Sequence, residues 1–220
     1  MYTIIGLYIT ALAFIPVFLY IFKKYKNNNK DKFLLDLSII LISMSAISLI
    51  LALGFTFIKY YSIAYGLSLV PGALVFGYLM KLSIEIYNTK KSYTFIGYIT
   101  MFIYFSEIFL IPKYPLHPHF FVLSNTYSYG QQGLLSTYDT IISILITLII
   151  VFNFLRFAVK IRADKFNRDR FLFTGLGILI AVTSITLPEI INNTYTSILG
   201  TIGYILGFGT AIIFISKKQI

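Results

Sequence analysis

Five carboxylates lie in or beside long apolar stretches of the sequence, where an ionised side chain is costly because its charge loses contact with water. They are Asp36, Glu85, Glu107, Asp139 and Glu189. Glu107 and Glu189 have no basic neighbour in the sequence. If both face the interior of a helix bundle, they are suited to carrying a proton or binding a cation. The other interpretation, that both simply reach outside water, stays open.

The remaining three acids have structural interpretations. Asp36 and Glu85 lie within a turn or two of predicted helix ends, where they can pair with Lys32 and Lys81 or reach lipid headgroups. Asp139 begins the fifth predicted helix, and a negative charge stabilises the N-terminus of a helix.

Three further residues could shape a path through a bundle. Asn153 is a polar side chain deep in a predicted span, where it either lines a pore or forms an interhelical hydrogen bond. Pro71 and Gly72 lie near the middle of the third span and predict a kink, because proline removes one helical hydrogen bond. Such kinks can serve as hinges, although they are also ordinary in membrane helices.

Two histidines, His117 and His119, flank Pro118 in the longest connection. In an extended strand they project to the same side, but two ligands do not make a metal site, and the chain has no Cys to supply thiolates. They are therefore weak metal candidates, and no cofactor is expected. The sequence also lacks a phosphate-binding Gly-rich loop, a serine nucleophile elbow and a His-rich metalloprotease motif, so enzymatic activity is not expected.

The elements that position these residues are apolar helices. Of 220 residues, 58% are hydrophobic and only 12% are charged, which leaves too little polar surface for a soluble domain. Seven segments have the roughly 20 apolar residues that a bilayer requires. They are residues 3–22, 33–57, 62–82, 93–111, 138–157, 171–190 and 197–215. The sequence predicts an all-α integral membrane protein with seven transmembrane helices and the lipid bilayer as its partner.

The basic residues predict the orientation of these spans. Sixteen of the 18 Lys and Arg fall on one side of the predicted membrane, and only Lys59 and Lys113 fall on the other. Because basic loops stay in the cytoplasm, the N-terminus is expected outside and the C-terminus inside, in the cell membrane. The net charge of +10 is explained by these short loops, so no nucleic-acid partner is expected.

An internal repeat relates the two ends of the chain. Residues 29–49 and 167–187 are identical at nine of 21 positions and begin with the same pattern, Asn-Lys/Arg-Asp-Lys/Arg-Phe-Leu. Two three-helix units can share one orientation only if another span lies between them. The single membrane domain 1–220 is therefore divided into a first repeat (1–87), a linker helix (93–111), an outer loop (112–137) and a second repeat (138–220). These repeats are expected to be parallel and related by a pseudo-twofold axis along the membrane normal.

The repeated motif has two interpretations. Its basic residues, Lys30, Lys32, Arg168 and Arg170, either anchor the topology or bind anionic lipid headgroups. In each copy the acid between the two bases could cap the following helix at its N-terminus and pair locally.

This layout resembles a known family. Phe14-Ile15-Pro16-Val17 followed by Lys23-Lys24 is similar to the first-helix proline and basic exit of SWEET sugar transporters and their PQ-loop relatives, which also have three, one and three helices. The second half has Asn153 where the first has Pro16, and no PQ dipeptide occurs. The resemblance implies a transporter with its path between two parallel repeats.

Three functions remain open. A small-solute or ion transporter is favoured by the duplication, the Pro71-Gly72 pair and the outer carboxylates. A non-catalytic subunit of a larger respiratory or secretory membrane complex, with other membrane subunits as partners, is favoured by the few buried ionisable residues. The third is a seven-helix sensor that acts through a separate protein.

Overall fold

The structure is a computed structural model that describes most of the chain. The described residues are 2–27, 31–85, 91–114, 116–118, 120–121, 126–127, 133–161, 163–190 and 194–216; at 91–94, 121, 126–127, 133, 136, 185–190, 194–198 and 215–216 only the backbone is described. Within these residues the chain forms seven α-helices. They are α1 (Tyr2–Asn27), α2 (Lys32–Thr56), α3 (Tyr61–Glu85), α4 (Lys91–Phe105), α5 (Gly133–Lys160), α6 (Lys165–Ile190) and α7 (Thr194–Ser216).

Each predicted span coincides with one of these helices. Among the described residues, four helical stretches are long and apolar enough to cross a membrane: Tyr2–Asn27, Lys32–Thr56, Ile58–Glu85 and Thr137–Lys160. Two shorter apolar stretches, Phe95–Phe109 and Leu199–Phe214, lie in the fourth and seventh spans. Length and composition therefore indicate a helical membrane protein.

The connections at one end of the bundle carry the remaining short elements. A 3-10 helix, η1 (Ile58–Tyr60), leads into α3, and a second, η2 (Ser106–Phe109), extends α4. The predicted outer loop contains two short antiparallel strands, β1 (Phe120–Phe121) and β2 (Thr126–Tyr127). The loop is shorter than predicted because α5 begins at Gly133 rather than near residue 138.

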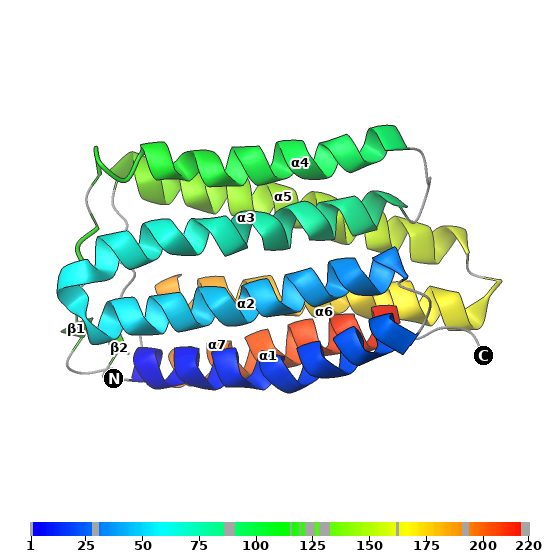
Figure 1. Cartoon of the computed structure of the whole chain (residues 1–220), viewed down its shortest axis with the longest axis horizontal. Coiled ribbons are helices and arrows are strands. Elements are labelled where there is room, and N and C mark those ends of the chain that lie inside the picture. The colour runs from blue at the N-terminus through cyan, green and yellow to red at the C-terminus, as the bar shows by residue number, and fades with distance from the viewer. Residues whose placement is uncertain are drawn as a thin grey trace.

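The helices pack as a closed ring with one helix outside it. Along the ring, contacting neighbours are α1 and α2, α2 and α3, α3 and α5, α5 and α6, α6 and α7, and α7 and α1. Helix α4 packs mainly against α3 (Figure 1). The two termini lie at opposite ends of the bundle (Figure 1), which are called here the N-terminal end and the C-terminal end.

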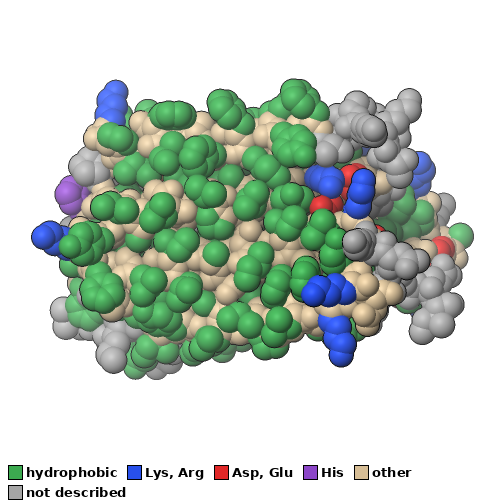
Figure 2. Space-filling view, in the orientation of Figure 1, with side chains coloured by type: hydrophobic (Ala, Val, Ile, Leu, Met, Phe, Trp, Pro, Cys, Tyr) green, Lys and Arg blue, Asp and Glu red, His purple; other side chains and the backbone are tan. Residues whose placement is uncertain are grey.

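Charge is distributed unevenly along the bundle. Figure 2 shows hydrophobic side chains over the whole flank in view, while most of the Lys and Arg gather towards the C-terminal end. An apolar flank with charged ends suits a protein surrounded by lipid, because the bilayer interior excludes charge.

Apolar side chains from both halves of the chain fill the bundle. The larger core cluster takes buried residues from all six helices of the ring, among them Phe14, Leu34, Leu79, Phe154 and Ile178. A second cluster lies at the N-terminal end and includes Phe55, Tyr61, Tyr65, Leu116 and Leu135. The interface between the halves is thus packed along most of its length.

The acid of the repeated motif caps a helix only in the first copy. Asp31 Oδ1 accepts a hydrogen bond of 3.0 Å from the backbone N–H of Phe33 at the start of α2, as predicted. In the second copy α6 begins earlier, so Asp169 lies inside the helix and its prediction as a cap is wrong. Asp164 takes that position: its Oδ1 accepts from the backbone N–H of Asn167 at 3.1 Å, and its Oδ2 accepts from the Asn167 side chain at 2.6 Å.

Replacing Asp164 with Ala is expected to lower the melting temperature of the detergent-solubilised protein modestly, because two donors lose their acceptor. The hydrogen bonds from Asn167 lower the pKa of Asp164 below its usual value. The stabilisation is therefore complete above the unfolded-state pKa of about 4 and is lost as the pH falls through the lower folded-state pKa. Melting curves of both proteins should converge in that acidic range; a difference independent of pH would contradict the assignment.

Candidate functional site

Glu107 is a buried carboxyl group at the N-terminal end of the bundle. It lies on η2, where the helix tightens after α4, and only 1% of the residue is exposed. Its Oε1 accepts a hydrogen bond from the hydroxyl of Tyr65 on α3. Of the two interpretations of Glu107, the structure supports the one in which it faces the bundle.

A second carboxyl group, that of Asp139 on α5, lies within hydrogen-bonding reach of Glu107. Asp139 is also the acceptor for Ser143 Oγ at 3.2 Å. Two carboxyl groups can hydrogen-bond to each other only if one carries a proton, because two carboxylates offer no donor. The arrangement can therefore hold one proton between α5 and η2.

The predicted role of Asp139 as an acid at a helix N-terminus is wrong. Helix α5 begins at Gly133, so Asp139 lies in its second turn, beyond the backbone N–H groups that lack helical partners. The earlier start is possible because Ser136 and Thr137, though polar, continue the helix into the apolar run. Asp139 instead faces Glu107.

Tyrosines surround this carboxyl pair. The ring of Tyr65 lies 6.3 Å from that of Tyr61, which is buried in the same cluster. The hydroxyls of Tyr138 and Ser106, the sequence neighbours of the two acids, lie 2.6 Å apart, and Tyr138 also donates to the carbonyl of Ile103 at 3.1 Å. These contacts join α5 to α4 and η2, and the hydrogen bond from Tyr65 to Glu107 joins η2 to α3, so the carboxyl pair is held between elements from both halves of the chain.

Pro71 and Gly72 lie on α3, between Tyr65 and the C-terminal end of the bundle. The helix continues from Tyr61 through Pro71 to Glu85. A Cβ added to Gly72 would lie 2.7 Å from Cε1 of Tyr104, on α4. Gly72 therefore gives the Tyr104 ring room to approach the α3 backbone. The predicted kink and hinge at this pair remain predictions.

The connection after η2 covers the N-terminal end. Leu116 is 5% exposed and belongs to the apolar cluster with Phe55 of α2, Tyr65 of α3 and Leu135 of α5. Tyr65, the partner of Glu107, is thus packed among apolar side chains from three elements. His117, next to Leu116, is exposed, while His119 lies outside the described residues. Within the described part of the chain, no three His, Asp or Glu side chains gather as metal ligands do.

Asn153 connects the halves nearer the C-terminal end. Its side-chain Nδ2 donates to Ser83 Oγ at 3.2 Å, which joins α5 to α3. Of the two interpretations of Asn153, this contact supports the interhelical hydrogen bond. Glu189, the other outer acid, lies near the end of α6, and its side chain lies outside the described residues.

The C-terminal end has a buried ion pair. Lys81 Nζ lies 3.7 Å from Glu85 Oε1, which confirms the predicted pair at i, i+4. Lys81 also lies 2.6 Å from Asp36 Oδ2, so Asp36 pairs with a lysine of α3 rather than with Lys32 on its own helix. Asp36 is 4% exposed, so its charge relies on this partner in place of water.

Replacing Asp36 with Asn is expected to destabilise the protein by about 2 kcal/mol, because Lys81 would keep a largely buried charge without its close partner. The double variant Asp36→Leu, Lys81→Met should recover much of that loss. Unfolding in detergent measures both. The matched control is Glu85→Gln, whose contact is longer and more exposed; a loss as large as that of Asp36→Asn would contradict the assigned pairing.

The structure describes three of the four lipid-headgroup candidates, namely Lys32, Arg168 and Arg170. Lys30 lies outside the described residues, and Lys32 is exposed. Arg168 pairs with Asp169 at 2.8 Å. Arg170 lies with its guanidinium 5.5 Å from the ring centre of Phe33 and 5.3 Å from that of Phe171.

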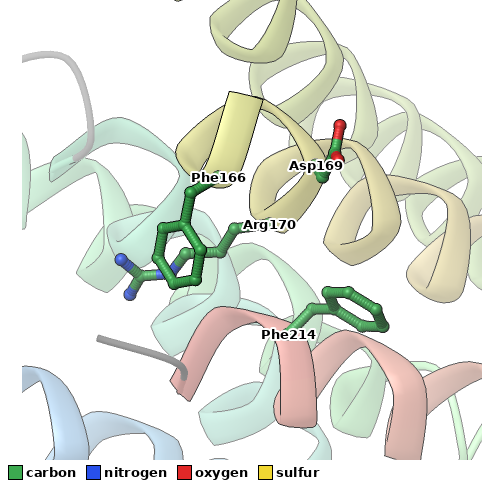
Figure 3. Close-up of a pocket in the computed structure, with 4 residues that line it drawn as sticks. All are labelled: Phe166, Asp169, Arg170 and Phe214. Carbon is green, nitrogen blue, oxygen red and sulfur yellow. The ribbon is translucent and has the colours of Figure 1, made fainter. Parts of the chain in front are cut away.

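A shallow hollow of about 180 Å³ lies beside Arg170, between the start of α6 and the end of α7. Phe166, Asp169, Arg170 and Phe214 line it (Figure 3). In Figure 3 the side chains of Asp169 and Arg170 point in opposite directions, and Arg170 is the one basic residue among the four that line the hollow.

Comparison with known proteins adds no residue roles. No model of a known protein family matches the chain, and a search of curated proteins finds no match. The class of protein therefore follows from the helices: an all-helical chain whose long apolar segments indicate a membrane protein.

Proposed function

We propose that the chain is an integral membrane protein with seven spans and that it transports a small solute or ion in a proton-coupled manner. Its N-terminus lies outside the cell and its C-terminus lies inside. This orientation is supported by the gathering of basic residues towards the C-terminal end of the bundle (Figure 2), since basic loops are retained in the cytoplasm.

The two halves form parallel repeats in this proposal, with α4 as the linker. Under the repeat, α1, α2 and α3 correspond to α5, α6 and α7. The contact of α1 with α7 then corresponds to the contact of α5 with α3, and these two contacts close the ring. A pseudo-twofold axis would produce this pattern of neighbours, and the transport path runs along it.

The observation that carries the proposal is the buried carboxyl pair. Glu107 is almost fully buried, receives the Tyr65 hydroxyl and lies within hydrogen-bonding reach of Asp139. Holding a charge among apolar helices is costly, so such acids commonly mark proton or ion pathways. Because Glu107 accepts from Tyr65 on α3 and lies beside Asp139 on α5, loading or releasing the proton changes a contact that connects the two halves through the linker. That change couples the proton to movement of the halves.

The test is transport by the purified protein in liposomes that contain a pH-sensitive dye. A panel of sugars, amino acids and monovalent cations is added outside under an imposed membrane potential. We expect at least one solute to produce a proton flux above that of protein-free liposomes. Absence of flux with every solute would contradict the proposal.

A second function, that of a non-catalytic subunit of a larger membrane complex, is favoured by the packed core. Buried side chains such as Phe14, Leu34 and Phe154 fill the space between the halves, where a path would run. A transporter would have to open this interface. Stoichiometric co-purification with a respiratory or secretory assembly, together with absent flux, would favour the subunit.

A further inference from the structure

Arg170 links the two halves at the C-terminal end of the bundle. It belongs to the second copy of the repeated motif, on α6, whereas Phe33 belongs to the first copy, on α2. The guanidinium lies 5.5 Å from the Phe33 ring centre and 5.3 Å from that of Phe171, within the range of cation–π attraction. Segments more than a hundred residues apart thus meet through one side chain.

The surrounding charges favour this cross-contact over a local pair. Asp169, the neighbour of Arg170 in sequence, is engaged by Arg168 at 2.9 Å from Nε and 2.8 Å from NH2. In Figure 3 Arg170 passes beside the Phe166 ring and points away from Asp169. Asp31, which caps α2 in the other half, interacts electrostatically with Arg170. Both the aromatic and the charged contact therefore reach across to the first half.

The core lies directly behind this contact. The Phe171 ring meets Phe157 of α5 edge-on at 4.9 Å, and Ala158 beside it is 2% exposed. At the other end of the bundle the apolar cluster with Leu116 packs α2 and α3 of the first half against α5 of the second. Separation of Arg170 from Phe33 would expose the core between the halves at the C-terminal end alone.

We propose that Arg170 is a latch that holds the two halves together at the C-terminal end, and that its release opens the interface on that side. The inference rests on the proposed function, in that the halves are taken to move against each other. Arginine suits the role because its flat guanidinium can stack on an aromatic ring and attract a carboxylate with its edge at the same time.

The absence of Cys from the chain allows a clean test. A single reporter, Ala158→Cys, lies behind the latch, and a second, Ala52→Cys, lies near the opposite end of α2, where the residue is 0% exposed. The rate of labelling by a small water-soluble thiol reagent is measured for each reporter with the full chain in lipid nanodiscs. Only opening of the packed core exposes either sulfur.

Arg170→Gln is expected to raise the labelling rate at position 158 about tenfold, because loss of a cation–π contact favours the open form, and to leave position 52 unchanged. Arg170→Lys, which keeps the charge but loses the flat stacking surface, should give an intermediate rate. The matched control, Lys165→Gln, removes an equal charge from an exposed position five residues away on the same helix and should change neither reporter.

Unchanged labelling at position 158 in Arg170→Gln would overturn the latch, as would an equal rise at both reporters, since that would indicate general loosening. An equal effect of Lys165→Gln would also overturn it, because net charge would then be the cause. The assay contains no transported solute. A positive result without flux in liposomes would therefore refute the transport function while supporting the latch.

Discussion

Gly207→Ala is expected to destabilise the protein by about 1–3 kcal/mol, because the added methyl group has no space. A Cβ at Gly207 would lie 2.6 Å from both the backbone nitrogen of Ala181 and the carbonyl oxygen of Gly177, on α6. Backbone atoms cannot move aside as a flexible side chain can, so α6 and α7 would have to separate. Gly207→Leu should prevent the two helices from packing at all.

The same helix offers a matched control at Gly209, where an added Cβ meets nothing within 4 Å. Gly209→Ala should be neutral or stabilise the protein by up to about 1 kcal/mol, since alanine is the better helix former. Thermal melting of each purified variant in detergent shows whether its stability falls or rises. Equal effects at both positions would show that helix propensity, rather than contact between the helices, determines the result.

Close backbone contact is a general route to stability among apolar helices. In lipid no hydrophobic force drives helices together, so small residues that bring backbones into van der Waals contact take its place. Gly177 and Gly207 form such a contact, since a Cβ on Gly177 would lie 2.5 Å from the Gly207 carbonyl oxygen. This contact holds the second half of the chain together independently of the carboxyl pair at the N-terminal end.

The sequence predicts the helices well because their length and apolarity are local properties. It also predicts the Lys81–Glu85 pair and the Asp31 cap, since these depend on spacing along one helix or at one helix end, whereas the Lys81–Asp36 pair joins two helices. It does not predict that Glu107 faces Tyr65 and Asp139. Helices that are apolar all round show no preferred buried face, so periodicity does not indicate which helix each side chain meets.

The sequence also does not predict the positions of Leu116 and Arg170, because these too depend on which helices meet. Leu116 lies in a polar-looking connection, and nothing local distinguishes a leucine that covers the bundle from one that is exposed. Arg170 and Phe33 are adjacent in space only because the two motif copies meet. The repeated motif contains a usable signal for that contact, because the parallel repeats that we propose would bring equivalent segments to the same end of the bundle. Tyr61 and Tyr65, four residues apart on α3, likewise mark one helical face.

Glu107→Gln is expected to reduce proton-coupled flux to the level of protein-free liposomes. The amide keeps the shape of the side chain and can still accept from Tyr65, but it cannot release a proton. Solute binding without proton coupling can survive, so flux is measured both with and without a pH gradient. The matched control is Glu85→Gln, the same chemical change at the C-terminal end of the bundle, where Glu85 ends α3. This variant should leave proton coupling intact.

The hydrogen bond itself can be tested apart from transport by a double-mutant cycle of Tyr65→Phe and Glu107→Leu, in which each single change removes one of the two polar groups. Because Tyr65 donates to a buried carboxyl group, the unfolding free energies of the two single variants and the double variant should show a coupling of roughly 1–2 kcal/mol. Additive effects would mean that the hydroxyl and carboxyl do not interact in the folded protein. Coupling with unchanged flux in Glu107→Gln would make the pair a structural contact, and the proton would then have to travel by another route.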